Sequence, residues 1–77
     1  MCPRYFFELE DGVSVADFEG LELPSLEVAC TEALKTLAEM AREVRPGPWD
    51  RQLACTVRDG KRPVYRLELT VRAVALA

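Results

Sequence analysis

A single stripe of apolar side chains at helical spacing runs through the middle of this chain. The residues of the stripe are Leu26, Ala29, Cys30, Ala33, Leu34, Leu37, Ala41 and Val44. Charged residues occupy the opposite side, and no glycine or proline interrupts the run before Pro46. This pattern predicts one amphipathic helix over residues 26 to about 44, with one face buried. Ser25, directly before the stripe, is expected to cap the first turn.

Segments on both sides of this helix alternate between apolar and polar residues. The alternating segments are residues 4–10, 13–18, 52–58 and 63–71. The apolar side chains expected to face inward are Tyr5, Phe7, Leu9, Val13, Val15, Leu53, Cys55, Val57, Tyr65, Leu67, Leu69 and Val71. A period of two is typical of half-buried strands. Asp11-Gly12 and Asp59-Gly60 are turn signals that would join the strands into two hairpins.

The order of these elements predicts an α+β fold of the form ββαββ. The 77 residues are enough for one small domain, residues 1–77, in which a four-stranded antiparallel sheet carries the helix on one face. The expected core comprises Phe7, Leu9, Leu26, Ala33, Leu37, Ala41, Val57, Leu67 and Leu69. Residues 45–48 are expected to end the helix, and Trp49 to cover one end of the core.

The composition argues against catalysis, a metal site and a cofactor. The chain has no histidine, which removes the commonest general base and metal ligand. Its three cysteines, Cys2, Cys30 and Cys55, are too widely spaced for a zinc or redox motif and do not form a disulfide framework. We expect Cys30 and Cys55 to be small buried side chains and Cys2 to be an exposed thiol.

The charge and the hydropathy pattern bear on partners and location. The net charge of −3 makes nucleic acid an unlikely partner, because nucleic-acid affinity depends largely on phosphate neutralisation. No run of about 20 apolar residues suggests a membrane span. Glu8, Glu10 and Asp11 interrupt the first apolar stretch, so we expect no signal peptide and a cytoplasmic protein.

The open face of the predicted sheet is the first candidate surface. Arg4, Phe6, Arg58 and Arg66, with Arg72, would lie there together with Glu8 and Glu68. One interpretation is an RNA-binding sheet, in which arginines surround an aromatic ring that stacks on bases. The other is a solvated face with cross-strand Arg–Glu pairs. The two glutamates and the acidic total favour the solvated face.

An acidic cluster near the N-terminus is the second candidate. Its members are Glu8, Glu10, Asp11, Asp17, Glu19 and Glu22. Calcium or magnesium could bind such carboxylates, but they lack EF-hand spacing, so a negative patch that meets a basic partner is the better hypothesis. Acid–base chemistry by a pair such as Glu8 and Glu10 would need a pocket that shifts their pKa values. A domain this small rarely encloses one, so we expect no enzyme.

The free sheet edges and Phe6 are the third candidate. An open sheet has unpaired backbone groups at its edges, which invite another strand. Phe6, Val64 and the apolar residues 74–77 could form an apolar patch for weak self-association or for another protein. The alternative is a monomer in which arginine side chains cover Phe6.

Three motifs give a family resemblance over nearly the whole chain. PRYFFELEDG (residues 3–12), FEGLELPSLEVA (18–29) and VRDGKR (57–62) resemble a family of small uncharacterised bacterial proteins with a domain of unknown function. More distantly, residues 23–34 are similar to HicB-type antitoxin domains, in which the comparable half caps a small toxin. That resemblance implies protein binding, since this chain lacks their separate DNA-binding segment. We therefore expect a protein-interaction module, such as an antitoxin-like or regulatory one, with an RNA- or DNA-binding sheet as the alternative.

Overall fold

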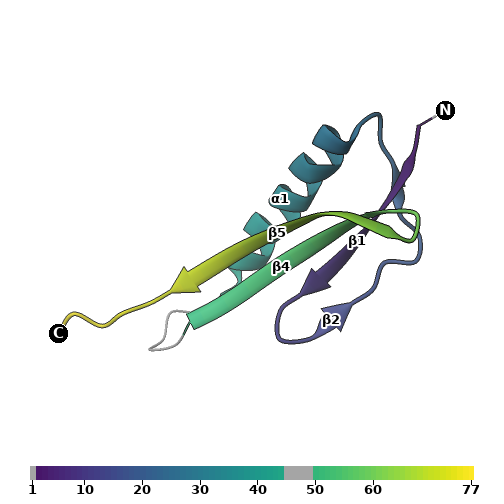
Figure 1. Cartoon of the computed structure of the whole chain (residues 1–77). Helices are drawn as coiled ribbons and strands as arrows, with labels where there is room; N and C mark the ends of the chain where they lie inside the picture. The colour runs from purple at the N-terminus through teal and green to yellow at the C-terminus, as the bar shows by residue number, and fades with distance from the viewer. Residues whose placement is uncertain (1, 45–49) are drawn as a thin grey trace.

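One helix packs on one face of an antiparallel sheet in this computed structural model, which describes residues 2–44 and 50–77 (Figure 1). The elements are β1 (Arg4–Glu10), β2 (Ser14–Val15), β3 (Leu21–Glu22), α1 (Leu26–Arg42), β4 (Asp50–Asp59) and β5 (Arg62–Arg72). The strand order is β2-β1-β4-β5, and β3 also pairs with β1. The predicted α+β class, with a single helix on an open antiparallel sheet, is confirmed. The strand β3 is an addition, because the short segment before the helix also joins the sheet.

The helix α1 starts where the sequence predicts and ends slightly earlier. The Ser25 hydroxyl accepts a hydrogen bond from the Val28 N–H at 3.2 Å and so caps the first turn. At the other end, the N–H groups of Glu43 and Val44 donate to carbonyls three residues back. This tighter turn ends the α-helix at Arg42, short of the predicted end near Val44.

The core lies between α1 and the central strands. Its buried cluster comprises Tyr5, Ala29, Ala33, Leu37, Leu53, Cys55 and Val57. Ala29 and Ala33 have small side chains, so the helix backbone can lie close to the sheet. The other residues predicted for the core, namely Phe7, Leu9, Leu26, Ala41, Leu67 and Leu69, pack against this cluster but are only partly buried.

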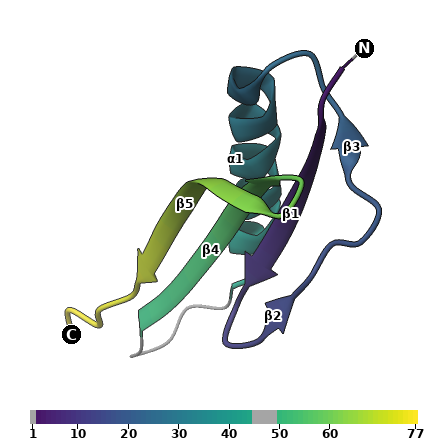
Figure 2. The ribbon, with the colours of Figure 1, turned by 45° about the vertical axis from the view of Figure 1, so that its right-hand side comes forward.

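The second predicted strand was wrong in length and in the burial of its side chains. Only Ser14 and Val15 pair with β1, and the chain then leaves the sheet before returning as β3 (Figure 2). Val15 lies opposite Leu9 and so on the helix side of the sheet, as predicted, but Val13 and Val15 remain 73% and 61% exposed. The helix makes its main contacts with β4 and β5, so it does not extend over this outer strand.

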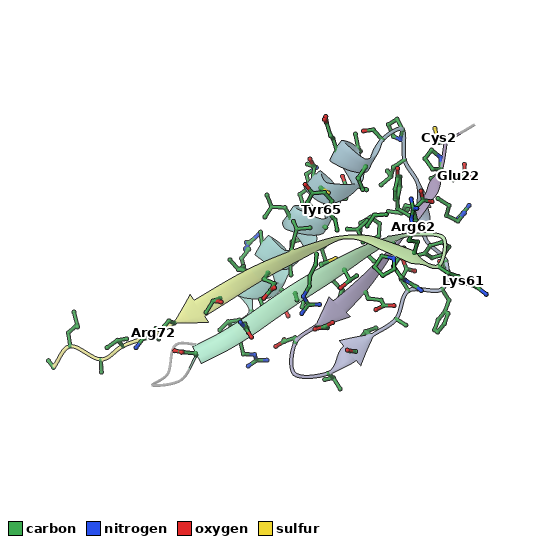
Figure 3. The ribbon with its side chains drawn as sticks, viewed as in Figure 1. Cys2, Glu22, Lys61, Arg62, Tyr65 and Arg72 are labelled. Carbon is green, nitrogen blue, oxygen red and sulfur yellow. The ribbon has the colours of Figure 1, made fainter. Side chains whose placement is uncertain are left out.

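Two further apolar side chains expected inside are exposed. Tyr65 is 55% exposed and Leu34 is 57% exposed. Tyr65 lies opposite the buried Val57 in the pairing of β4 with β5. The part of α1 beside it is the first turns of the helix, which leave its side chain largely uncovered (Figure 3). Leu34 lies at the edge of the helical stripe, one turn after the half-buried Cys30, so the sheet does not cover it.

The cysteines follow the prediction in two cases of three. Cys55 is buried and Cys2 is exposed, as expected, whereas Cys30 is only half-buried. The three thiols are free. The predictions for Trp49 and for the connector at 45–48 fall outside the described residues. Among the residues that the structure describes, no helix is long and apolar enough to cross a membrane.

Candidate functional site

The predicted site residues do share the open face of the sheet. Phe6 on β1 lies directly opposite Arg58 on β4, and Thr56 on β4 lies opposite Arg66 on β5. Arg4 lies two residues before Phe6, on the same face of β1. Strand alternation and the antiparallel register therefore bring these side chains onto one surface.

Arg58 is held between an aromatic ring and a carboxylate. Its guanidinium carbon lies 5.7 Å from the centroid of the Phe6 ring, within the range of a cation–π contact. Its Nε lies 3.2 Å from Glu8 Oε1, which makes an ion pair but not an aligned hydrogen bond. The Arg58 side chain consequently covers part of Phe6, which is half-buried.

Arg66 makes the most extensive polar contacts on this face. Both of its terminal nitrogens donate to the Glu10 carboxylate, each at 3.0 Å. It also donates to the Thr56 hydroxyl at 3.2 Å, and its Nε lies 3.5 Å from Glu68. The hydrogen bond from Arg66 lowers the pKa of Glu10, and the reciprocal hydrogen bond raises the pKa of Arg66.

Arg4 anchors the chain at the other end of β1. Its guanidinium donates to the Glu19 carbonyl at 2.6 Å and to Glu22 Oε1 at 3.1 Å. Arg4, Arg58 and Arg66 therefore each have a carboxylate partner within the chain. The cross-strand Arg–Glu arrangement considered for the open face is the one that the structure contains.

The apolar patch predicted around Phe6 is not assembled. Val64 packs against the core cluster instead of joining Phe6, because a bulge in β5 shifts its register next to Val57 and Arg58. The residues 73–77 follow Arg72, which lies opposite Asp50 at the far end of the sheet from the Phe6–Arg58 pair (Figure 1). Val64 and Phe6 therefore lie on opposite faces, and residues 73–77 lie at the other end of the sheet, so the three groups do not form one patch.

The acidic cluster is divided among separate partners. Glu8, Glu10 and Glu22 pair with the open-face arginines, and Asp11 accepts two hydrogen bonds from Arg51 at 2.6 and 3.1 Å. The hydrogen bond from Arg51 lowers the pKa of Asp11. Among the described residues, no group of three or more potential ligands could hold a metal ion. The cluster thus acts mainly as counter-charge for arginines.

Asp17 has a structural role that the sequence prediction missed. Its Oδ1 accepts hydrogen bonds from the N–H groups of Glu19 at 3.0 Å and Gly20 at 3.1 Å, and its Oδ2 accepts one from Phe7 at 3.2 Å. It therefore fills the gap between β2 and β3 along the edge of β1. An aspartate followed three residues later by glycine is a typical turn signal, and this signal could have indicated the loop.

A charged hollow of about 460 Å³ lies at one end of the sheet. Its lining includes Glu10, Asp11, Arg51, Arg66 and Glu68. Glu10 and Asp11 have lowered pKa values, so they are ionised near neutral pH and can only accept hydrogen bonds. A general acid would need a raised pKa, and these two carboxyl groups are shifted in the opposite direction.

The outer edge of β5 presents unpaired backbone groups. Phe7 directs its N–H away from β4, toward Asp17. Phe7 lies opposite Val57, so the N–H and C=O of Val57 point away from β1 and toward β5. Val57 lies opposite Tyr65, so the N–H and C=O of Tyr65 point toward β4, and those of Leu67 and Leu69 follow by alternation. The groups directed outward belong to Arg66, Glu68, Thr70 and Arg72. Within residues 2–44 and 50–77, no strand pairs with this edge.

Exposed apolar side chains lie beside this free edge on the helix side. Tyr65 lines a hollow of about 690 Å³ together with Ser25, Leu26, Glu27 and Cys30. Leu34 extends the same flank of α1 by one turn. We call the free edge together with this apolar flank the β5 strip. It comprises the outward backbone groups of Arg66, Glu68 and Thr70 and the exposed side chains of Tyr65 and Leu34.

A second exposed apolar region lies along the opposite side of the sheet. It comprises Val13, Val15, Phe18 and Leu21, of which Phe18 is 88% exposed. Here the strands β2 and β3 are only two residues long, and Asp17 already occupies the backbone of β1 between them. This side therefore offers apolar side chains but little free backbone.

Comparison with known proteins places the chain in a family. A family model described as a domain of unknown function, DUF6894, matches residues 4–70. No curated protein and no solved structure matches the chain. The match extends from the first residue of β1 almost to the end of β5, and it includes all the motifs noted in the sequence except Pro3. The chain therefore belongs to the DUF6894 family, a domain of unknown function.

Proposed function

We propose that this chain is a non-enzymatic protein-interaction module that binds an extended segment of a partner along the β5 strip. The observation that carries the proposal is the free edge of β5 beside the exposed side chains of Tyr65 and Leu34. Main-chain hydrogen bonds to an edge strand supply affinity, and neighbouring apolar side chains supply selectivity. The similarity of residues 23–34 to HicB-type antitoxin domains suggests one partner class within this proposal, a small toxin protein.

The open face is the weaker candidate for the interaction. Arg58 and Arg66 are held by Glu8 and Glu10, so a new partner would have to displace those carboxylates. The alternative function, an RNA- or DNA-binding sheet, faces the same obstacle. It would appear as RNA affinity that falls steeply with salt, because phosphate contacts release counterions.

A proline substitution at the free edge tests the proposal. The wild-type protein is used to select peptides from a displayed random library, and the selected peptides are then measured against Thr70→Pro and Thr70→Ala. Proline removes an outward N–H without removing a hydrogen bond to β4, whereas alanine keeps that N–H. We expect binding to Thr70→Ala at the wild-type level and a loss of about tenfold for Thr70→Pro.

Two outcomes would overturn the proposal. The first is a selection that yields no binding peptide. The second is a set of peptides that bind Thr70→Pro as tightly as the wild type, since these would use another surface. Circular dichroism of both variants checks that the fold is retained. RNA affinity measured over a series of salt concentrations tests the alternative function.

A further inference from the structure

We infer that a second copy of this chain occupies the β5 strip, through antiparallel β5–β5 pairing about a two-fold axis at Leu67. The inference rests on the proposed function, because it names the partner for that surface. It follows from the sequence of β5, residues 62–72, RPVYRLELTVR. In this arrangement, each copy presents the same strand to the other, as a two-fold interface requires.

The symmetry limits which registers are possible. Directly opposed residues in a sheet share a face, so the axis must fall on a residue and not between two residues. The bulge near Val64 restricts regular pairing to Tyr65 and the residues after it. The axis can therefore lie only within a few positions of β5, and the side chains of these positions decide among them.

Charge and the position of Tyr65 within β5 together select the register centred on Leu67. In that register, Arg66 of each copy lies opposite Glu68 of the other. An axis on Arg66 would oppose two arginines, an axis on Glu68 would oppose two glutamates, and an axis on Leu69 would oppose Arg66 to Arg72. An axis on Thr70 or Val71 avoids like charges, but it would place the partners of Tyr65 and Arg66 beyond Arg72, outside β5. Like charges directly opposite each other on a sheet are destabilising, and opposite charges are stabilising.

The backbone and the helix side agree with this register. Arg66 and Glu68 direct their N–H and C=O groups outward, so the opposed pair would exchange both backbone hydrogen bonds. On the helix face, Tyr65 of each copy would lie opposite Leu69 of the other. This contact would cover the Tyr65 side chain, which is 55% exposed in the single chain.

Complementary charge reversal tests the register. Glu68→Arg places arginine opposite arginine across the axis, and Arg66→Glu places glutamate opposite glutamate. Two copies of the same variant should therefore repel each other. An equimolar mixture restores opposite charges at both positions. We expect wild-type protein to dimerise in sedimentation velocity at high micromolar concentration, each variant alone to bind at least about tenfold more weakly, and the mixture to recover dimers.

The control variant is Glu39→Arg, which makes the same change in charge on the exposed side of α1. It should sediment as the wild type does. Arg66→Glu also breaks the contact with Glu10, so circular dichroism must show that the variant is folded. A second measurement needs no variant: in the wild type, amide hydrogen exchange at Arg66 and Glu68 should slow as concentration rises.

The inference is overturned if the wild type remains monomeric throughout the concentration range. It is also overturned if Glu68→Arg dimerises as well as the wild type, or if the mixture stays monomeric while both variants are folded. These outcomes are separate from those of the peptide experiment. A monomeric wild type that binds extended peptides at β5 would refute the second copy and leave the proposed function standing.

Discussion

The carboxylate of Asp17 accepts a hydrogen bond from the backbone N–H of Phe7 at 3.2 Å, across ten residues of chain. The same carboxylate holds the loop that separates β2 from β3. One side chain thus replaces the strand partner that β1 lacks at this point. This edge of the sheet is closed by a side chain, while the edge at β5 stays open.

Replacing Asp17 by asparagine should destabilise the protein. The amide group has one acceptor oxygen where the carboxylate has two, so at least one of the three N–H donors loses its partner. We expect a loss of about 1–3 kcal/mol in the free energy of unfolding, measured by urea denaturation. Glu19→Gln, in the same loop, is the control and should change little. Equal stability of the two variants would show that the Asp17 contacts are not important.

The stability of the protein should decline in acid. Burial raises the pKa of Asp17, but hydrogen bonds from Gly20, Phe7 and Glu19 and the charge of Arg58 outweigh it, so the pKa lies below the ordinary 3.8. A carboxyl group with a lowered pKa stabilises the fold above its ordinary pKa, and this stabilisation is lost as the pH falls toward the lowered value. Glu10 and Asp11 are shifted in the same direction.

The measurement is the melting temperature between pH 7 and pH 2. It should be nearly level down to about pH 4 and then fall. Asp17→Asn should show a smaller fall than the wild type, because one of the titrating groups has been removed. An identical acid profile for both proteins would contradict the assignment to Asp17.

Gly20 and Gly12 should respond differently to alanine. Both have a positive φ, +69° and +77°, so alanine at either position carries a backbone cost of about 1–2 kcal/mol. At Gly20 a Cβ would also lie 2.8 Å from the Tyr5 carbonyl oxygen, whereas at Gly12 it would meet nothing within 4 Å. Thermal melting should therefore show a larger loss for Gly20→Ala, and equal losses would refute the close approach.

Leu37 and Leu34 provide a matched pair on the same helix. Leu37 is 1% exposed within the core, so Leu37→Ala should cost about 2–5 kcal/mol. That loss is enough to unfold much of a domain whose core supplies only about 3–5 kcal/mol. Leu34→Ala removes the same atoms from an exposed site, and its effect on the melting temperature at low protein concentration should be small. A large effect at Leu34 alone would mean that the two faces of α1 are misassigned.

The thiols should differ in reactivity. Burial, and secondarily the neighbouring Cys30, raises the pKa of Cys55 to about 11, so its thiolate is scarce at pH 8. Burial also raises the pKa of Cys30. Iodoacetamide followed by peptide mass spectrometry should find Cys2 modified first and Cys55 modified only after denaturation. Rapid labelling of Cys55 in the native protein would contradict its burial.

The sequence alone determined the elements whose side-chain period is long and clear. The helical stripe located α1, and alternation located β1, β4 and β5 with their buried residues Leu53, Cys55 and Val57. These patterns are readable because each repeats over several turns or residues, and each has to be buried against another such element. The same alternation brought Arg4, Phe6, Arg58 and Arg66 onto one face.

Only the tertiary structure decided what those residues do and where the sheet ends. The arginines pair with glutamates from other strands, which depends on register and not on any one strand. Val15 and Tyr65 are exposed because the single helix covers the middle of the sheet and not its margins. Asp17 replaces a strand with a side chain, a role set by its position in space between β2 and β3. Long-range geometry of this kind has no periodic signal in the sequence, and so it appears only once the chain is folded.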